Sequence, residues 1–464
     1  MSTQIIPTEV SDEAPVQIRA YYAAPGENPA LANAPKFANP KQAAMAMEWL
    51  PDLGPGNDIS ADDRILLPTS SHTRLVLAVA RAVRASAQER NLADSAFQAK
   101  IIQAHRFVNH RRDARNHPTS RTAATLSNVA AKVHFAVVPD GAGQHALVHA
   151  LDRVFNAGHG IYEVPLQGRQ QGMRFARMDT IVAQFPPNGR PVTFARALVK
   201  QINPIFETRI GRLSFSDDEV TTTVQSLLLS LNVGLLIIGP VSGRISAPEK
   251  AGEMWSMLAQ VAASTGIPIV IVGAPGAAVN MVTHGDGVAA LTSRGSYIIQ
   301  PVAPGSRESI NASTLIWLKY FRRAGTEAPE WFHPALTSLT QGNIEYAVAL
   351  GAYVASVWEA GGEVRLSPKI LEAHAARALV LHKSTLDSNQ AAKAGKSFTL
   401  YRLKQLADGL PLEIAIEARS KLEDEDDYTQ KREIKPAPAI IEGNFEVPAT
   451  EAASKYDTNT GAPK

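Results

Sequence analysis

Residues 266–275 read GIPIVIVGAP, a run of Ile and Val bounded by a glycine on each side. Such continuous apolar runs are typical of strands that are buried on both faces of a sheet. Four further stretches are predicted as strands, namely HFAVV (134–138), RMDTIVAQF (177–185), GLLIIG (234–239) and SYIIQPV (296–302). Because segments with helical periodicity separate most of these runs, the sequence predicts an α/β core with a mostly parallel sheet covered on both faces.

The rest of the chain is organised around this core. Repeated Pro and Gly residues predict an extended N-terminal arm at 1–60, and long apolar periodicities predict a helical N-terminal region at 61–118. The α/β core follows at 119–305, and a helical lid subdomain is predicted at 306–417. The tail at 418–464 contains the acidic run LEDEDD and several prolines, a composition that predicts disorder.

Composition excludes several classes of function. The 464 residues contain 46 Lys and Arg against 44 Asp and Glu, so the chain is not a strongly basic nucleic-acid binder and any such contact must be local. There is no cysteine, which excludes disulfides, thiolate zinc sites and a cysteine nucleophile. The chain has no apolar run of 18 residues and its first residues do not resemble a signal peptide. We therefore expect a cytoplasmic protein with no membrane partner and no metal site.

A glycine-rich turn follows the strand predicted at 134–138. The stretch VVPDGAGQHAL (137–147) runs from a strand through this turn into a helix, the context in which backbone N–H groups can bind phosphate. Against the pattern G-x-x-x-x-G-K-[ST], the lysine position falls on Gln144 and the hydroxyl position on His145. Neither side chain supplies the usual chemistry, so the stretch is a degenerate nucleotide loop or an ordinary turn. Its residues are Pro139, Asp140, Gly141, Ala142, Gly143, Gln144 and His145.

A second motif position is altered in the same way. The strand LLIIGPVSGR (235–244) stands where a nucleotide hydrolase carries four apolar residues followed by Asp and Glu. In this chain Gly239 and Pro240 occupy those positions. Neither residue can orient magnesium or polarise an attacking water molecule, so the sequence predicts no catalytic residue here.

From Ser120 to about Lys383 the chain resembles the AAA+ transposition regulators of the TnsC/TniB type, which are relatives of the MuB target-selection protein. The resemblance lies in the order of motifs. After the glycine turn come GLLII where the family has LLVIDE, and GIPIVIVGAPGAA (266–278) where it reads like GVPVVLVGTPKA. SRG (293–295) and LTQGNIEYAVAL (339–350) follow, the latter where the family reads like LSQGITDLAVKL.

The resemblance implies an AAA+-like P-loop core whose subunits form homo- or hetero-oligomers, bind DNA and link a target selector of the TniQ/TnsD type to a DDE transposase. The family's polar sensor falls on Ala274 and its basic lid position on Ala349, and Arg294 could correspond to the arginine that acts on a neighbouring subunit. With these positions altered, the chain resembles a pseudo-ATPase. We expect it to regulate assembly without hydrolysing ATP and to need no cofactor.

Two groups of arginines could contact DNA phosphates. The first lies at the end of a predicted helix within 105–118, and the second in a predicted polar connection at 166–177. These candidates are Arg106, Arg111, Arg112 and Arg115 in the first group, and Arg169, Arg174 and Arg177 in the second. Clusters of this kind also occur on ordinary solvated surfaces.

Two other functions remain open at this point. An active but atypical AAA+ ATPase would bind ATP and magnesium through the backbone amides of 140–145 and borrow its lysine and acid from elsewhere. A structural or interaction protein on a degenerate AAA+ fold would have no role in DNA transactions. Nucleotide affinity distinguishes the first alternative, and DNA affinity at low salt distinguishes the second.

Overall fold

The computed structural model divides into two units, Met1–Arg419 and Ser420–Lys464. All described residues except Ser420 belong to the first unit. The structure describes residues 19–22, 28–49, 65–110, 125–126, 129–164, 173–205, 219–248, 250–283, 287–362, 364–394, 406–417 and 420.

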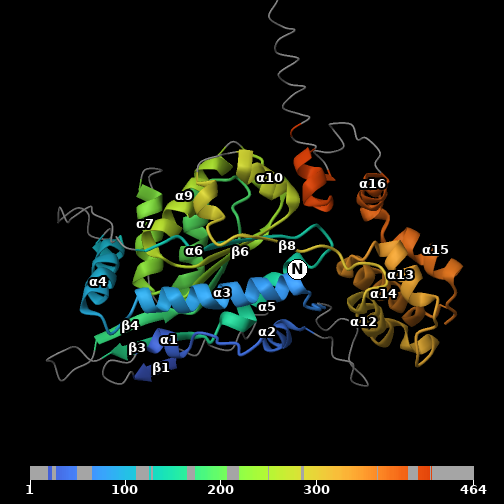
Figure 1. Cartoon of the computed structure of the whole chain (residues 1–464), viewed down its shortest axis with the longest axis horizontal. Helices are drawn as coiled ribbons and strands as arrows, with labels where there is room; N and C mark the ends of the chain where they lie inside the picture. Colours follow the sequence, from blue (N-terminus) through green and yellow to red (C-terminus); the bar gives the residue numbers. More distant parts are fainter. Residues whose placement is uncertain are drawn as a thin grey trace, which may run out of the picture. The chain divides into compact units, whose positions relative to one another are not determined.

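A five-stranded sheet, parallel throughout, forms the centre of the first unit (Figure 1). Its spatial order is β5-β6-β7-β2-β8, so β2, which precedes the glycine turn, is an internal strand. The predicted α/β fold with a parallel sheet is confirmed. The strands are β2 (Val133–Val137), β5 (Thr180–Ala183), β6 (Leu235–Val241), β7 (Ile269–Gly273) and β8 (Ser296–Ile298).

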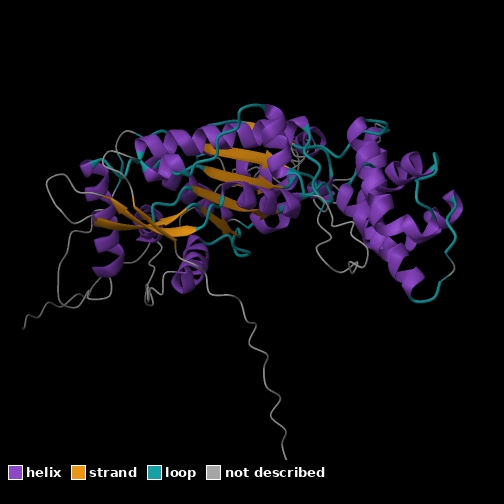
Figure 2. Ribbon diagram, turned by 90° about the horizontal axis from the view of Figure 1, so that it is seen from below, coloured by secondary structure: helices purple, strands orange, loops and turns teal. Residues whose placement is uncertain are grey.

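Helices cover both faces of this sheet (Figure 2). Alternate residues of β2 point to opposite faces, with Phe135 in one apolar cluster and Ala136 in the other. The first cluster includes helices α6 (Pro191–Ile205), α7 (Val220–Ser230) and α9 (Ala251–Thr265). The second includes α2 (Pro40–Met47), α3 (Ser70–Glu89) and α5 (Gln144–Phe155).

The N-terminal helices contribute directly to the α/β core. Ala43 and Met47 of α2 and Leu75 of α3 are fully buried in the second cluster. Part of the arm predicted at 1–60 and part of the helical region predicted at 61–118 therefore cover the sheet. The reason is that α5 alone does not cover this face, and α3 completes it beside β2 and β8.

A small sheet lies beside the main one and was not predicted. It has the order β1-β3-β4, with β1 (Arg19–Tyr22) parallel to β3 (His159–Val164) and β4 (Met173–Met178) antiparallel to β3. Helix α4 (Ser95–His110) shares an apolar cluster with β3 and β4. The single strand predicted at 177–185 is wrong, because the chain passes between the two sheets at Asp179, where β4 ends and β5 begins.

After the sheet the chain is helical and forms its own apolar cluster, as the sequence predicts. Trp317, Phe321 and Phe332 pack edge to face or stacked at the centre of their apolar cluster. The elements are α12 (Arg307–Ile316), a π-helical turn (Trp317–Phe321), α13 (Phe332–Thr340), α14 (Ile344–Glu359), α15 (Pro368–Ala378) and α16 (Lys383–Lys393). We call 307–393 the helical subdomain.

Short elements complete the described part of the chain. They are α1 (Pro29–Ala32), α8 (Gly243–Ser246), α10 (Pro275–Thr283), α11 (Val288–Leu291) and the 3-10 turns Arg322–Ala324, Val380–His382 and Ala407–Gly409. None of the described helices combines the length and the apolar character needed to cross a lipid bilayer.

Candidate functional site

The carboxyl ends of the parallel strands meet at one edge of the main sheet, where open α/β sheets bind their ligands. The turn after β2 at 138–143, the start of α8 after β6 and the start of α10 after β7 all lie at this edge. We refer to this place as the carboxyl edge. It contains most of the positions at which the sequence predicts a degenerate nucleotide site.

The glycine turn has the backbone geometry that its sequence predicts. Gly141 has φ +82° and Gly143 has φ +97°, both in the left-handed region that favours glycine. Ala142 N–H donates to the carbonyl of Pro139 at 3.0 Å, and α5 begins at Gln144 immediately after the turn. The strand, turn and helix are therefore in the order that a phosphate loop requires.

The side chain at the lysine position folds back into the protein. Gln144 is buried, and its Nε2 donates to the carbonyl oxygen of Val138 at 2.6 Å and to Oδ1 of Asp140 at 3.3 Å. A neutral amide held in this way carries no positive charge toward a phosphate group. His145 is exposed on the first turn of α5.

Side chains of the helical subdomain cover the turn. The ring of Tyr346 packs against Gly141 so closely that a Cβ on this glycine would lie 2.6 Å from the ring. The neighbouring Glu345 donates its backbone N–H to the carbonyl of Gly141 at 3.1 Å. Tyr346 also lies over the imidazole of His382, with ring centroids 4.5 Å apart. The ring of Tyr346 thus covers the turn at Gly141.

Two carboxyl groups at this place are partly shielded from water. Burial raises the pKa of Asp140, and His382, the hydrogen bond from Gln144 and His145 oppose the shift. Burial also raises the pKa of Glu345, a shift that His145 opposes and Asp140 reinforces. Acidic side chains beside the turn repel a phosphate rather than attract it.

Asp408, which sequence reasoning missed, reaches the same edge from far along the chain. Its carboxylate oxygens accept hydrogen bonds from the backbone N–H of Gly243 at 2.8 and 3.0 Å, and the backbones of Arg244 and Gly276 also donate to it. Its carbonyl accepts the backbone N–H of Asp140 at 2.9 Å. One residue therefore contacts the segments that follow β2, β6 and β7.

Gly239 and Pro240 lie within β6, and the packing of the sheet explains why no acid stands there. A Cβ at Gly239 would overlap the carbonyl oxygen of Val272 in the adjacent strand β7. Gly239 also has φ +141°, a conformation that side chains rarely adopt. Ala274 is fully buried after β7, and Ala349 is exposed on α14. An aspartate at 239 would require β6 and β7 to move apart.

Arg294 lies away from the glycine turn. Its backbone N–H donates to the carbonyl of Val133, the first residue of β2, and its side chain is exposed just before β8 begins. Parallel strands place these residues at the amino edge of the sheet, opposite to the carboxyl edge. Arg294 therefore lies at the opposite edge of the sheet from the glycine turn of its own chain.

The structure separates the arginines predicted to contact DNA. Arg106 is exposed on α4, and Arg174 is exposed on β4 with Nε 3.1 Å from the carboxylate of Glu163. Arg177 is buried, with Nε 2.7 Å from Oδ1 of Asp179, so the prediction that it contacts DNA is wrong. It lies on the inward side of β4, which the sequence prediction treated as a polar loop. Arg111, Arg112, Arg115 and Arg169 lie outside the described residues.

A different group of exposed arginines surrounds Tyr297 on β8. Arg74 and Arg81 lie two helical turns apart on α3, and both lie near enough to Tyr297 to oppose the rise in its pKa that burial causes. The hydroxyl of Tyr297 donates to the carbonyl of Arg294 at 3.2 Å. We call Arg74, Arg81, Arg294 and Tyr297 the arginine patch. In the sequence, only the seven-residue spacing of Arg74 and Arg81 indicates that these two arginines lie on the same face of a helix.

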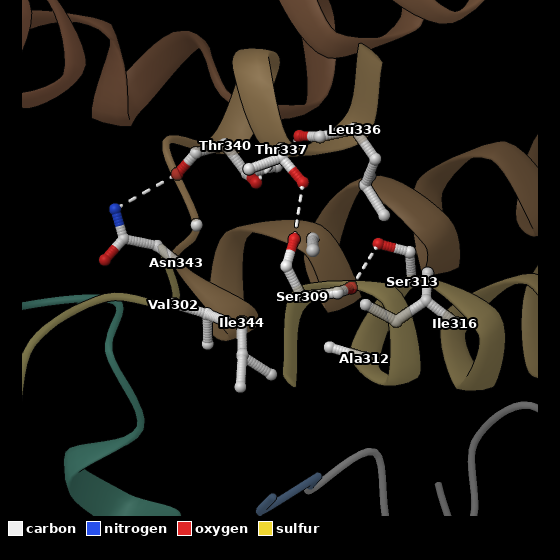
Figure 3. A pocket seen from close by; sticks show the side chains of 12 residues that line it. Val302, Ser309, Ala312, Ser313, Ile316, Leu336, Thr337, Thr340, Asn343 and Ile344 are labelled. Atoms are coloured by element: carbon white, nitrogen blue, oxygen red, sulfur yellow. Dashed lines mark hydrogen bonds between the residues drawn. The ribbon is translucent and has the colours of Figure 1, made fainter. Parts of the chain in front are cut away.

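The helical subdomain contains a small cavity between α12, α13 and α14 (Figure 3). Ser309 and Thr337 are hydrogen-bonded across it at 3.0 Å, and Asn343 donates to the carbonyl of Thr340 at 3.1 Å. Its volume of about 20 Å³ accommodates one water molecule, not a nucleotide. Among the described residues, no group of three or more His, Asp or Glu side chains is arranged to hold a metal ion.

No protein-family model matches the chain, and no curated protein sequence matches it. What the structure establishes is an α/β fold with a five-stranded parallel sheet and a carboxyl edge occupied by the chain's own side chains.

Proposed function

We propose that this protein is a regulator or adaptor of the TnsC/TniB type that assembles without hydrolysing ATP. The observation that carries the proposal is the packing of Tyr346 against Gly141 together with the inward-folded Gln144. A phosphate loop needs backbone N–H groups that a phosphate can reach and a positively charged side chain. In this chain Tyr346 covers the turn, and the neutral Gln144 stands at the lysine position. An internal β2 that leads into a left-handed glycine turn supports an AAA+-like origin of the core.

Assembly in this proposal depends on DNA and protein partners instead of nucleotide. Within the arginine patch, Arg74 and Arg81 place two exposed cations near the ring of Tyr297, a combination that suits phosphate contact. By the resemblance, the partners are a DDE transposase, a target selector of the TniQ/TnsD type and other AAA+ subunits. Arg294 would then act on a competent neighbour in a mixed assembly.

The proposal is tested by titrating the full chain with a fluorescent ATP analogue and magnesium, with and without duplex DNA at low salt. Light scattering follows particle size in the same samples. We expect assembly on DNA that does not depend on nucleotide. Saturable nucleotide binding that drives assembly would favour the atypical ATPase, and absence of DNA binding at low salt would favour the interaction protein without a DNA role.

Charge reversal in the arginine patch should weaken DNA binding. We expect the double variant Arg74→Glu/Arg81→Glu to lose at least about tenfold in affinity for duplex DNA and to show a shallower dependence on salt, because fewer counterions are released. Electrophoretic mobility or fluorescence anisotropy at several salt concentrations measures both effects. Arg322→Glu/Arg323→Glu is the matched control, since these arginines are exposed in the helical subdomain. If both double variants lose the same affinity for DNA, the arginine patch is not a specific part of the DNA-binding surface.

A further inference from the structure

Titratable side chains gather where the glycine turn meets the helical subdomain. Asp140 lies in the turn, Glu345 lies in the first turn of α14, and Asp408 lies in the 3-10 turn Ala407–Gly409. The backbone N–H of Asp140 donates to the carbonyl of Asp408 at 2.9 Å, and the backbone N–H of Glu345 donates to the carbonyl of Gly141 at 3.1 Å. These two bonds bring together side chains from three segments that are far apart in the sequence.

The negative charge of Asp140 acts on its neighbours. Burial raises the pKa of Glu345, Tyr346 and Asp408, and the charge of Asp140 raises each pKa further. Burial raises the pKa of Asp140 as well. Because water screens these groups only in part, the carboxylates repel one another when all of them are ionised. The cluster therefore binds a proton more readily than the same groups do in water.

Other groups on the surrounding elements oppose this effect without cancelling it. His145 on α5 opposes the pKa shifts of Asp140 and Glu345, and His382 opposes the shift of Asp140. At Asp408 the opposing groups are the backbone N–H groups of Gly243, Gly276 and Arg244. Helix α10 has no titratable residue, and the described charged side chains of α8 and α16 are exposed, namely Arg244, Lys383 and Asp387. The pKa of Asp408 stays at about 6, against an ordinary value of 3.8.

The proton affinity of Asp408 depends on whether this contact is closed. Opening the contact would return the carboxyl to water and to the ordinary pKa of 3.8, so the closed arrangement binds the proton more tightly. By linkage, the stabilisation of the closed arrangement is fully present below pH 3.8 and is lost as the pH rises through about 6. Between about pH 5 and pH 8 this carboxyl alone should raise the equilibrium constant for opening about tenfold.

We propose that the contact between the glycine turn, α14 and Ala407–Gly409 is a pH-sensitive latch, which is held closed when its carboxyl cluster carries a proton and loosens when the proton leaves. The latch also involves the helical subdomain, because Gly409 packs on Thr385 of α16 and Tyr346 packs on Gly141. Its release would uncover the turn. The inference goes beyond the proposed function and does not depend on it, since the latch requires no DNA, nucleotide or second subunit.

The test measures hydrogen exchange of the full-length chain at about pH 5 and pH 8, with each rate divided by the chemical exchange rate at the same pH. In the wild type we expect the protection of 139–145 and 344–350 to fall about tenfold or more at the higher pH. Asp408→Asn keeps an oxygen that can accept the N–H of Gly243 but cannot ionise, so its fall should be about tenfold smaller. Glu413→Gln is the matched control and should behave as the wild type, because Glu413 is an exposed acid that follows the latch.

Carbon-13 spectra of the aspartate carboxyl groups give an independent readout. The wild type should show a carboxyl that titrates near pH 6, and Asp408→Asn should lack it. Asp140→Asn removes the neighbouring negative charge and should lower the midpoint of Asp408. This second variant tests the cluster even where Asp408→Asn does not fold.

Two results would overturn the latch. One is a carboxyl of Asp408 that titrates near its ordinary pKa of about 4. The other is a fall in protection that is as large in Asp408→Asn as in the wild type. Either result would leave the nucleotide-independent assembly untouched, because titration with the ATP analogue tests that proposal separately.

Discussion

Acidification from pH 7 to pH 4 should lower the free energy of unfolding by about 3 kcal/mol for each of two buried histidines, His72 and His134. Burial lowers the pKa of both groups from 6.5 to about 4, and the charge of Arg294 adds to the effect at His134. The unfolded chain therefore binds protons between pH 6.5 and 4 that the folded chain does not bind. The contribution of the two neutral histidines to the free energy of unfolding is fully present above pH 6.5 and is lost as the pH falls from 6.5 to 4.

The surroundings of the two rings explain why they resist protonation. Nδ1 of His72 accepts the backbone N–H of Thr69 at 3.1 Å and so caps α3, a bond that a proton on Nδ1 would remove. Both ring nitrogens of His134 are buried without a hydrogen-bond partner, beside the ring of Tyr297. A positive charge at either place would have no compensating contact.

Asp408 acts in the opposite direction and must be separated from the histidines. Its pKa in the folded chain is about 6 against an ordinary value of 3.8, so its protonation stabilises the fold by about 3 kcal/mol as the pH falls through this range. The contribution of Asp408 is the same in the wild type and in a histidine variant, so it cancels when the two proteins are compared. In His134→Leu the loss of stability between pH 7 and pH 4 should be smaller than in wild type by about 3 kcal/mol.

Chemical denaturation followed by tryptophan fluorescence at the two pH values measures this difference. His149→Gln is the control for the removal of an imidazole, because His149 is exposed on α5. If His134→Leu loses as much stability on acidification as the wild type, the imidazole of His134 is not held neutral in the sheet.

The strands of the main sheet other than β5 could be predicted from short, mostly apolar runs, whereas β5 was merged with the end of β4 into one strand at 177–185. Val133–Val137 and Ile269–Gly273 are completely buried, and nothing in their composition competes with the strand. The small sheet was missed because β3 alternates between buried and half-buried residues over only six positions, and β4 carries Arg174 and Arg177. Arg177 illustrates the difficulty, since its partner Asp179 allows a charged side chain to lie inward.

The candidate site could be predicted only where its residues are adjacent in the chain. The strand, the glycine turn and the helix at 133–155 follow from local sequence, including the left-handed glycines. The groups that occupy the turn come from distant segments. Asp408 and Gly243 are 165 residues apart, and no local pattern marks either as a partner of the other. Tyr346 lies within an apolar helix in which aromatic residues are expected for packing alone.

Gly141→Ala should destabilise the protein by about 3 kcal/mol, which is more than the same change at Gly143. Both glycines have positive φ, so either alanine costs about 1 kcal/mol or more in backbone strain. A Cβ at Gly141 would also lie 2.6 Å from the Tyr346 ring, whereas at Gly143 the nearest atom is Leu66 Cδ1 at 4.0 Å. The difference between the two variants therefore reports the contact between the ring and the turn.

A double-mutant cycle that combines Gly141→Ala with Tyr346→Ala measures the contact between the tyrosine ring and the turn directly. If Tyr346 occupies the approach to the turn, Tyr346→Ala should relieve the steric part of the Gly141→Ala cost and leave only the backbone strain, as measured by chemical denaturation. Gly143→Ala combined with Tyr346→Ala should instead show additive effects. Equal costs for the two glycine variants, or additivity in both cycles, would mean that the ring does not press on the turn in solution. The turn would then be open to a phosphate, and the case for a regulator that works without nucleotide would lose the contact on which it depends.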